Sequence, residues 1–123
     1  GLAAGKYEVR VGGKKIAELS DGQLAIGANL AAGALTDGPI ADQAKAVKAA
    51  VEAKNRFHHD MIFRGIVLSN VPEWVYSVVS REELEAKKSG IIQERLAKLP
   101  ALDAEVAKSL AMKANTFDIV PVK

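Results

Sequence analysis

The fold is decided by the stretch from Lys6 to Leu19, which reads KYEVRVGGKKIAEL. Tyr7, Val9 and Val11 alternate with charged residues, and this period of two is typical of a strand with one buried face. A second short strand follows the two glycines in the middle of the stretch. The alternation predicts a β-hairpin within residues 1–19.

The turn of this hairpin is expected at Gly12-Gly13. Two consecutive glycines supply the positive φ angles that a tight two-residue turn requires. With the glycines at the turn centre, Val11 lies opposite Lys14, and Val9 lies opposite Ile16 on the apolar face.

Residues 20–65 read as a short helix followed by a long one. Ser20-Asp21-Gly22-Gln23 has the spacing of a capping box, and Gly27 is suited to end the short helix. A loop is expected from Gly33 onward, with Thr36 or Asp37 as the cap of the long helix.

The long helix begins near Ile40 and is expected to end by Gly65. Its apolar positions recur every three or four residues and so share one face. They are Ile40, Ala44, Val47, Val51, His58 and Met61 (or Ile62). We expect Ile40, Ala44, Val47 and Val51 of this face to be buried, either under the hairpin or against a second subunit.

Residues 66–79 are apolar but contain Pro72, so they are expected to form a loop or short extended pieces.

Residues 80–123 are expected to form two helices and a terminal strand. A capping box at Ser80-Arg81-Glu82-Glu83 begins the first helix, Pro100 ends it, and Asp103 caps the second. The strand contains Phe117, Ile119 and Val120, and Pro121 marks an edge position. The whole chain is therefore expected to be α+β, a small antiparallel sheet covered by about three main helices in one domain or fragment.

Composition limits the function classes. The chain has 123 residues, no cysteine and a formal net charge of +2. Thiol catalysis, disulfides and zinc–thiolate sites are excluded, and no apolar run approaches the ~20 residues of a membrane span. The charges are mixed along the chain, which argues against nucleic acid as a partner.

His58, His59 and Asp60 form one cluster of metal-ligand residue types. Adjacent histidines on a helix point about 100° apart, and the i,i+4 spacing of helical zinc sites is missing. We therefore expect no metal or other cofactor. One histidine is expected to pack or cap near the helix end, with the other in solvent and His59 paired locally with Asp60.

Serine catalysis needs a serine in a forced turn, a histidine base and oxyanion donors. No serine lies in a Gly-x-Ser-x-Gly or Gly-Asp-Ser block, and no Asp-x-x-His pair occurs, so we assign no catalytic residue. The six serines are Ser20, Ser69, Ser77, Ser80, Ser89 and Ser109.

Two further groups of residues have a structural and a functional interpretation. Trp74 with Tyr76 could stack on a sugar, but a lone tryptophan in an apolar segment is more often packed in a core. The hairpin also carries basic residues diluted by Glu8 and Glu18, which favours a solvated face over a nucleic-acid platform. These basic residues are Lys6, Arg10, Lys14 and Lys15.

The first half of the chain resembles the region downstream of the catalytic core in bacterial SGNH (GDSL-type) hydrolases. The similar pieces are Gly1–Ala17 with its "gL-x-x-G-x-Y-x-v-x-v-d-G" pattern, in which Gly12 stands at the Asp position, Gly27-Ala28-Asn29-Leu30-Ala31, and Thr36 followed by Gln43-Ala44-Lys45-Ala46-Val47. Asn55-Arg56-Phe57-His58-His59 and the close Phe117–Val122 are also similar to such proteins.

This resemblance implies a C-terminal, non-catalytic segment of a larger esterase. The family's catalytic serine, oxyanion residues and Asp-x-x-His pair would precede Gly1, and Asn29 does not match the oxyanion asparagine. The implied parent uses no metal, cleaves acyl esters such as acetyl groups on carbohydrate, and is usually exported to the periplasm or the exterior. The segment would support the catalytic core or mediate association, including homo-oligomer formation. The alternative from another class is an independent interaction module that binds a partner through an apolar helix face.

Overall fold

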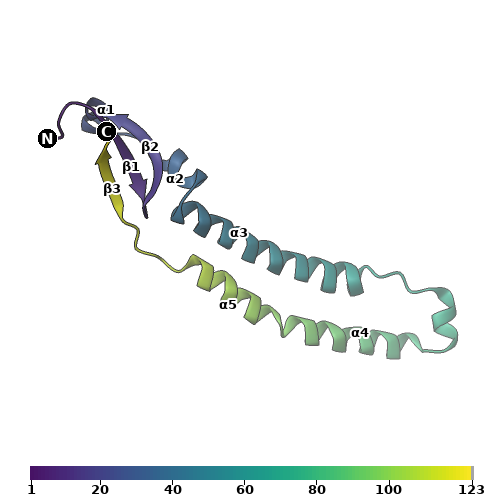
Figure 1. Cartoon of the computed structure of the whole chain (residues 1–123). Helices are drawn as coiled ribbons and strands as arrows, with labels where there is room; N and C mark the ends of the chain where they lie inside the picture. The colour runs from purple at the N-terminus through teal and green to yellow at the C-terminus, as the bar shows by residue number, and fades with distance from the viewer. Residues whose placement is uncertain (123) are drawn as a thin grey trace. The chain divides into compact units, whose positions relative to one another are not determined.

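The computed structural model describes residues 1–122 and shows the expected α+β fold (Figure 1). The chain divides into two units, which we describe separately. The sheet unit comprises residues 1–47 and 110–122, and the helical unit comprises residues 48–109.

The predicted hairpin is confirmed as strands β1 (Lys6–Val11) and β2 (Lys14–Ser20). Gly12 and Gly13 form the turn with φ angles of +57° and +82°, so both occupy the left-handed region that favours glycine.

The register of the hairpin differs from the prediction at one point. Val11 pairs with Lys14 as expected, but Val9 pairs with Ala17 instead of Ile16. The register shifts between Val9 and Arg10, which makes Ile16 the extra residue of a β-bulge. Strict alternation across a two-residue turn does not allow for an inserted residue, so the sequence pattern misplaced this pair.

The expected terminal strand is also confirmed. Strand β3 (Phe117–Pro121) pairs antiparallel with β1, giving the sheet order β2-β1-β3. Pro121 lies on an edge strand, as predicted. Tyr7, Val9 and Val11 of the central strand are buried and form the middle of the sheet unit's core.

Helix α2 (Ala31–Thr36) occupies the segment where a loop was expected from Gly33. The Asn29 side chain accepts a hydrogen bond from the Ala31 amide and so stabilises the start of the helix. Gly33 lies so close to β2 that a Cβ atom on it would be 2.2 Å from the Ile16 carbonyl oxygen. The glycine permits this contact between helix and strand and does not end a helix.

Both capping boxes are confirmed. Ser20 accepts from the Gln23 amide at the start of α1 (Asp21–Ile26), and Ser80 accepts from the Glu83 amide at the start of α4 (Arg81–Leu96). Gly27, with φ of +88°, follows α1 as its C-cap.

The long helix is α3 (Pro39–Arg56), which continues as a π-helix η1 (Phe57–Val67). Neither proposed side-chain cap is at its start: Asp37 accepts from the Gly38 amide, and the Thr36 hydroxyl donates to the Ala32 carbonyl.

Burial of the helix stripe under the hairpin is not seen for Ala44 and Val51, and burial of the stripe against a second subunit stays a prediction. Ala44, Val51, His58 and Met61 are exposed, and Ile40 and Val47 are half-buried. The residues that are buried along this segment are Ala41, Ile62 and Ile66. A helical period shows which residues share a face, but burial requires a covering element, and few side chains cover this one.

Residues 66–79 are more regular than the expected loop. Ile66 and Val67 end η1, and a 3-10 helix η2 (Glu73–Ser77) follows Pro72. The proline precedes the first helical residue and therefore removes no helical hydrogen bond.

Pro100 does not end a helix, contrary to the prediction. Helix α4 ends at Leu96, and Pro100 is the second residue of α5 (Leu99–Leu110). A first-turn position suits proline because amides there have no intrahelical acceptor. Asp103 consequently lies inside α5, where its carboxylate pairs with Lys54 Nζ of α3.

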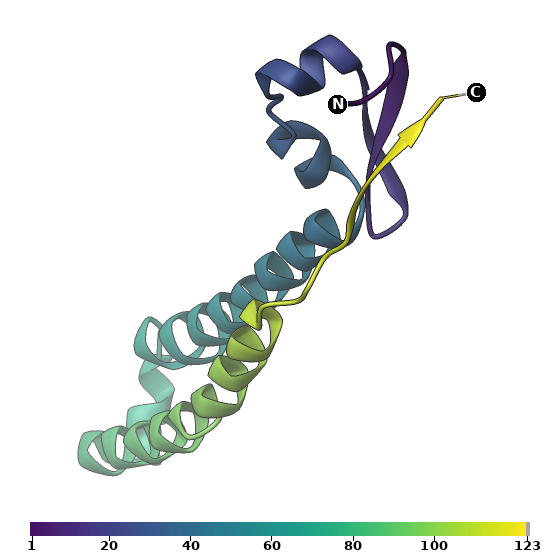
Figure 2. The ribbon, with the colours of Figure 1, turned by 90° about the vertical axis from the view of Figure 1, so that its left-hand side faces the viewer.

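The helical unit is a hairpin of helices. The chain runs out along the end of α3 and η1, turns through η2, and returns along α4 and α5 (Figures 1 and 2). Arg95 of α4 donates to the Met61 carbonyl of η1 and joins the two arms.

Candidate functional site

The histidine cluster is a solvent-exposed stretch of η1. His58 and His59 are both exposed, so the expectation that one of them packs is wrong. The His59–Asp60 pair forms as expected, with 2.9 Å between Nδ1 and Oδ1, and the His59 ring lies 6.2 Å from that of Phe63. Residues 1–122 hold no group of three or more His, Asp or Glu side chains arranged to bind a metal.

Five of the six serine hydroxyls make local hydrogen bonds. Ser20 and Ser80 cap helices, while three others donate to the carbonyl three residues earlier. Those three are Ser69, Ser77 and Ser109. Ser89 lines a shallow cavity of about 290 Å³ between η1 and α4, together with Glu85 and Lys88. The hydrogen bonds of Ser20 and Ser80 are those of helix caps, and the bonds of Ser69, Ser77 and Ser109 to the carbonyl three residues earlier are local helix contacts.

Trp74 is not a core residue. Its side chain is 68% exposed, and Tyr76 is exposed too, with the Arg81 guanidinium 5.1 Å from the centre of its ring. The two aromatic residues are two positions apart on a 3-10 helix, which rotates about 120° per residue, so they do not share a face. A flat sugar-stacking platform made by both rings is therefore not present.

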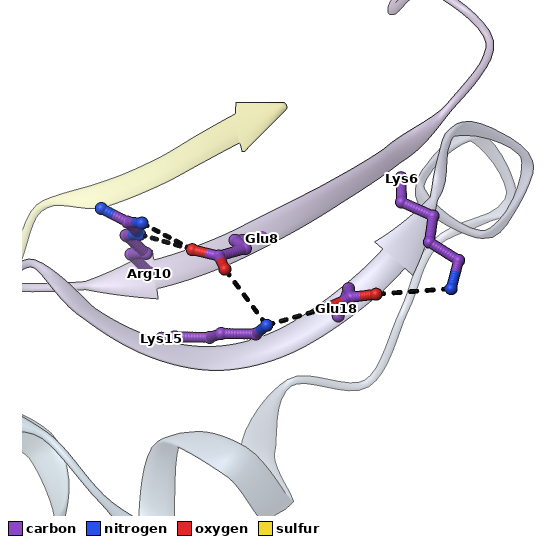
Figure 3. A network of polar contacts seen from close by, with 5 residues as sticks. All are labelled: Lys6, Glu8, Arg10, Lys15 and Glu18. Atoms are coloured by element: carbon purple, nitrogen blue, oxygen red, sulfur yellow. Dashed lines mark hydrogen bonds and ion pairs between the residues drawn. The ribbon is translucent and has the colours of Figure 1, made fainter. Parts of the chain in front are cut away.

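The charged residues of the hairpin form an ion-pair network on the polar face of the sheet (Figure 3). Glu8 accepts from Arg10 Nη2 at 2.6 Å and lies 3.1 Å from Lys15 Nζ. Lys15 also contacts Glu18 at 2.8 Å, and Glu18 contacts Lys6 at 3.5 Å. Each of these three cations is paired with a carboxylate of the same face. The network therefore offers no row of unpaired positive charges to a phosphate backbone.

The network shifts the pKa values of three of its members in the directions that favour their charged forms. Hydrogen bonds from Arg10 and then Lys15 lower the pKa of Glu8, and Lys15 followed by Lys6 lowers the pKa of Glu18. Hydrogen bonds to Glu18 and Glu8 raise the pKa of Lys15. The fourth basic residue, Lys14, lies outside the network and pairs with Asp37 at 3.4 Å.

The strongest candidate for a functional surface is the turn of the helical hairpin, which we call the apolar tip. It displays five large apolar or aromatic side chains to solvent within twelve residues. They are Val67, Leu68, Trp74, Tyr76 and Val78. The sequence of this segment suggested a packed core or a sugar-stacking pair, because an apolar run in a sequence does not show whether another element covers it.

The helical unit has almost no interior of its own. Within residues 48–109, only Ile62 and Ile66 are buried, and both lie on η1 where it packs against α4. Independent domains of about 60 residues bury roughly 60% of their chain's surface and depend on a continuous apolar core. The helical unit therefore lacks the continuous apolar core that is typical of an independent domain of this size.

No protein family, curated protein or solved structure matches this chain in the three comparisons made. No helix within residues 1–122 is long and apolar enough to cross a membrane. The evidence for the apolar tip as a functional surface is therefore its exposed apolar side chains.

Proposed function

We propose that this chain is a C-terminal accessory segment of an SGNH (GDSL-type) ester hydrolase, without a complete catalytic site of its own. In this proposal the helical unit packs on the catalytic core through its apolar tip, and the sheet unit holds the segment together. The observation that carries the proposal is the helical unit with two buried side chains and an exposed apolar tip.

The residues behind the family resemblance support a structural role. Gly12-Gly13 forms a turn, Asn29 stabilises the start of α2, and Gln43 donates to the Ala111 carbonyl at 2.8 Å within the sheet unit. Such residues preserve a fold and need no substrate. Acyl-ester chemistry, a carbohydrate ester substrate and export from the cell belong to the proposed parent enzyme.

The test combines the chain with a separately produced SGNH core from the same parent gene. We expect the two to co-elute and the core to melt at a higher temperature, because burial of apolar surface favours the complex and ligand binding stabilises the native state. The double variant Trp74→Ala, Val78→Asp should weaken both effects, while Lys48→Asp, on the exposed side of α3, should not. A core whose elution and melting temperature ignore the chain would refute the proposal.

The apolar tip also favours a second candidate, an independent module that binds an unrelated protein. Such a module would bind its partner through the same Trp74 and Val78 side chains but would leave the SGNH core unaffected. The core-binding experiment therefore separates the two candidates.

A further inference from the structure

The two edges of the sheet differ in what lies beside them. On β2, helix α2 packs against the strand, and Gly33 brings the helix backbone against the Ile16 carbonyl. On β3, no strand of residues 1–122 pairs with the outer side. An uncovered edge is a template for pairing with another strand.

The backbone groups at the outer side of β3 follow from its pairing with β1. Gly12 donates to the Thr116 carbonyl and Val122 donates to the Lys6 carbonyl, both at 2.9 Å. Alternate residues of an antiparallel strand bond to opposite sides. Phe117 and Ile119 therefore direct their N–H and C=O groups outward, and Pro121 directs only a carbonyl.

The side chains of these same residues extend the apolar face beyond the core. Ile119 lies opposite Val9 and Phe117 lies opposite Val11, so all four share one face of the sheet. The two valines are buried, whereas Phe117 and Ile119 are 56% and 48% exposed. A further strand at this edge would satisfy the outward backbone groups and cover these two side chains together.

We propose that this strand is β3 of a second copy of the chain, antiparallel to the first about a two-fold axis at Ile119. Three symmetric registers are open to two antiparallel copies of β3, and they differ in charge and in hydrogen bonding. An axis at Asp118 places two carboxylates directly opposite each other, which is unfavourable. An axis at Val120 places Ile119 opposite Pro121, which has no N–H to donate.

The register centred on Ile119 avoids the carboxylate pair, and although Phe117 lies opposite Pro121, this register forms four hydrogen bonds among residues 117–121 where the Val120 register forms two. The two Ile119 residues exchange N–H···O=C bonds, and each Phe117 amide donates to the Pro121 carbonyl of the other copy. Asp118 lies opposite Val120 of the other copy instead of opposite itself. The result is a six-stranded sheet with one continuous apolar face, in which Pro121 serves as an acceptor. This inference is independent of the assignment to hydrolases.

The test uses single cysteines, since the chain has none of its own. In Ile119→Cys the two Cα atoms would be about 5.5 Å apart across the axis. In the control Phe117→Cys, of similar exposure, they would be four residues apart along the strands, on the order of 13 Å. A short thiol cross-linker should therefore join Ile119→Cys chains and leave Phe117→Cys chains largely unjoined, while light scattering gives twice the chain mass for both.

A second variant tests the hydrogen bonds. Ile119→Pro removes an N–H that the sheet itself does not use, and it should weaken dimerisation on the order of tenfold or more. Ile119→Thr keeps that N–H and should weaken dimerisation less. A chain that stays monomeric at high concentration, or equal cross-linking at positions 117 and 119, would overturn the proposal.

Discussion

The burial of the central strand can be tested by one substitution made at two valines of contrasting environment. Val9 of β1 is 2% exposed, and Val78 beside the apolar tip's 3-10 helix is 71% exposed. Valine to alanine removes the same two carbon atoms at both sites, so the difference between the variants reports their burial together with the strand propensity of valine at position 9.

The expected loss is large at Val9. At about 0.8 kcal/mol for each buried carbon, transfer accounts for roughly 1.6 kcal/mol, and the cavity left in the core raises the total to about 2–3 kcal/mol. At Val78 less than a third of the residue's surface is buried, so the loss of stability should be about 0.5 kcal/mol or less. For a domain of this size, 1 kcal/mol corresponds to a melting shift of about 4–8 °C.

The assay is urea unfolding followed by the NMR amide signals of β1 and of the segment near Val78, so that each unit is read separately. Val9→Ala should lower the unfolding midpoint of the β1 signals, and Val78→Ala should leave both sets nearly unchanged. Equal free energies of unfolding for the two variants would show that the sheet does not have the core described.

Three further outcomes are expected. Gly33→Ala should destabilise the sheet unit, because its Cβ would lie 2.2 Å from a backbone oxygen. Gly90→Ala, with open space around it, should stabilise α4 by about 0.5–1 kcal/mol. The two variants should therefore shift the melting temperature in opposite directions, and shifts of the same sign would contradict this expectation. Lys15→Met should lower the melting temperature at neutral pH but much less at about pH 3. Glu8 and Glu18 have lowered pKa values in the fold, so the stability they contribute is present above the ordinary glutamate pKa and is lost as pH falls through the lowered values. A loss of melting temperature that does not depend on pH would contradict the ion-pair network. The chain alone should not hydrolyse p-nitrophenyl acetate above the buffer rate, and turnover blocked by a serine-directed inhibitor would contradict the absence of a nucleophile.

Local signals in the sequence predicted local structure well. The alternation in β1, the glycine turn and the capping boxes at Ser20 and Ser80 depend on neighbouring residues only, and all are present in the structure. Pro100 was misinterpreted because proline is compatible both with the end of one helix and with the first turn of the next.

Burial was harder to predict because it depends on distant elements. The period of α3 was real, yet Ala44 and Val51 are exposed since little covers that side, and Trp74 was expected in a core that the helical unit does not possess. The bulge at Ile16 likewise belongs to tertiary structure, where α2 approaches β2. The candidate surface was therefore missed for the same reason: its residues look like core until the fold shows that nothing covers them.

The proposed packing of the helical unit on a catalytic core is tested most directly by amide hydrogen exchange. In the isolated chain, the amides of residues 48–109 should exchange much faster than those of Tyr7, Val9 and Val11, because few buried contacts oppose opening of the helices. Addition of the SGNH core should slow exchange around the apolar tip and leave the β1 amides unchanged. Protection of the helical unit as strong as that of β1 in the isolated chain, with no change when the core is added, would contradict the proposed packing.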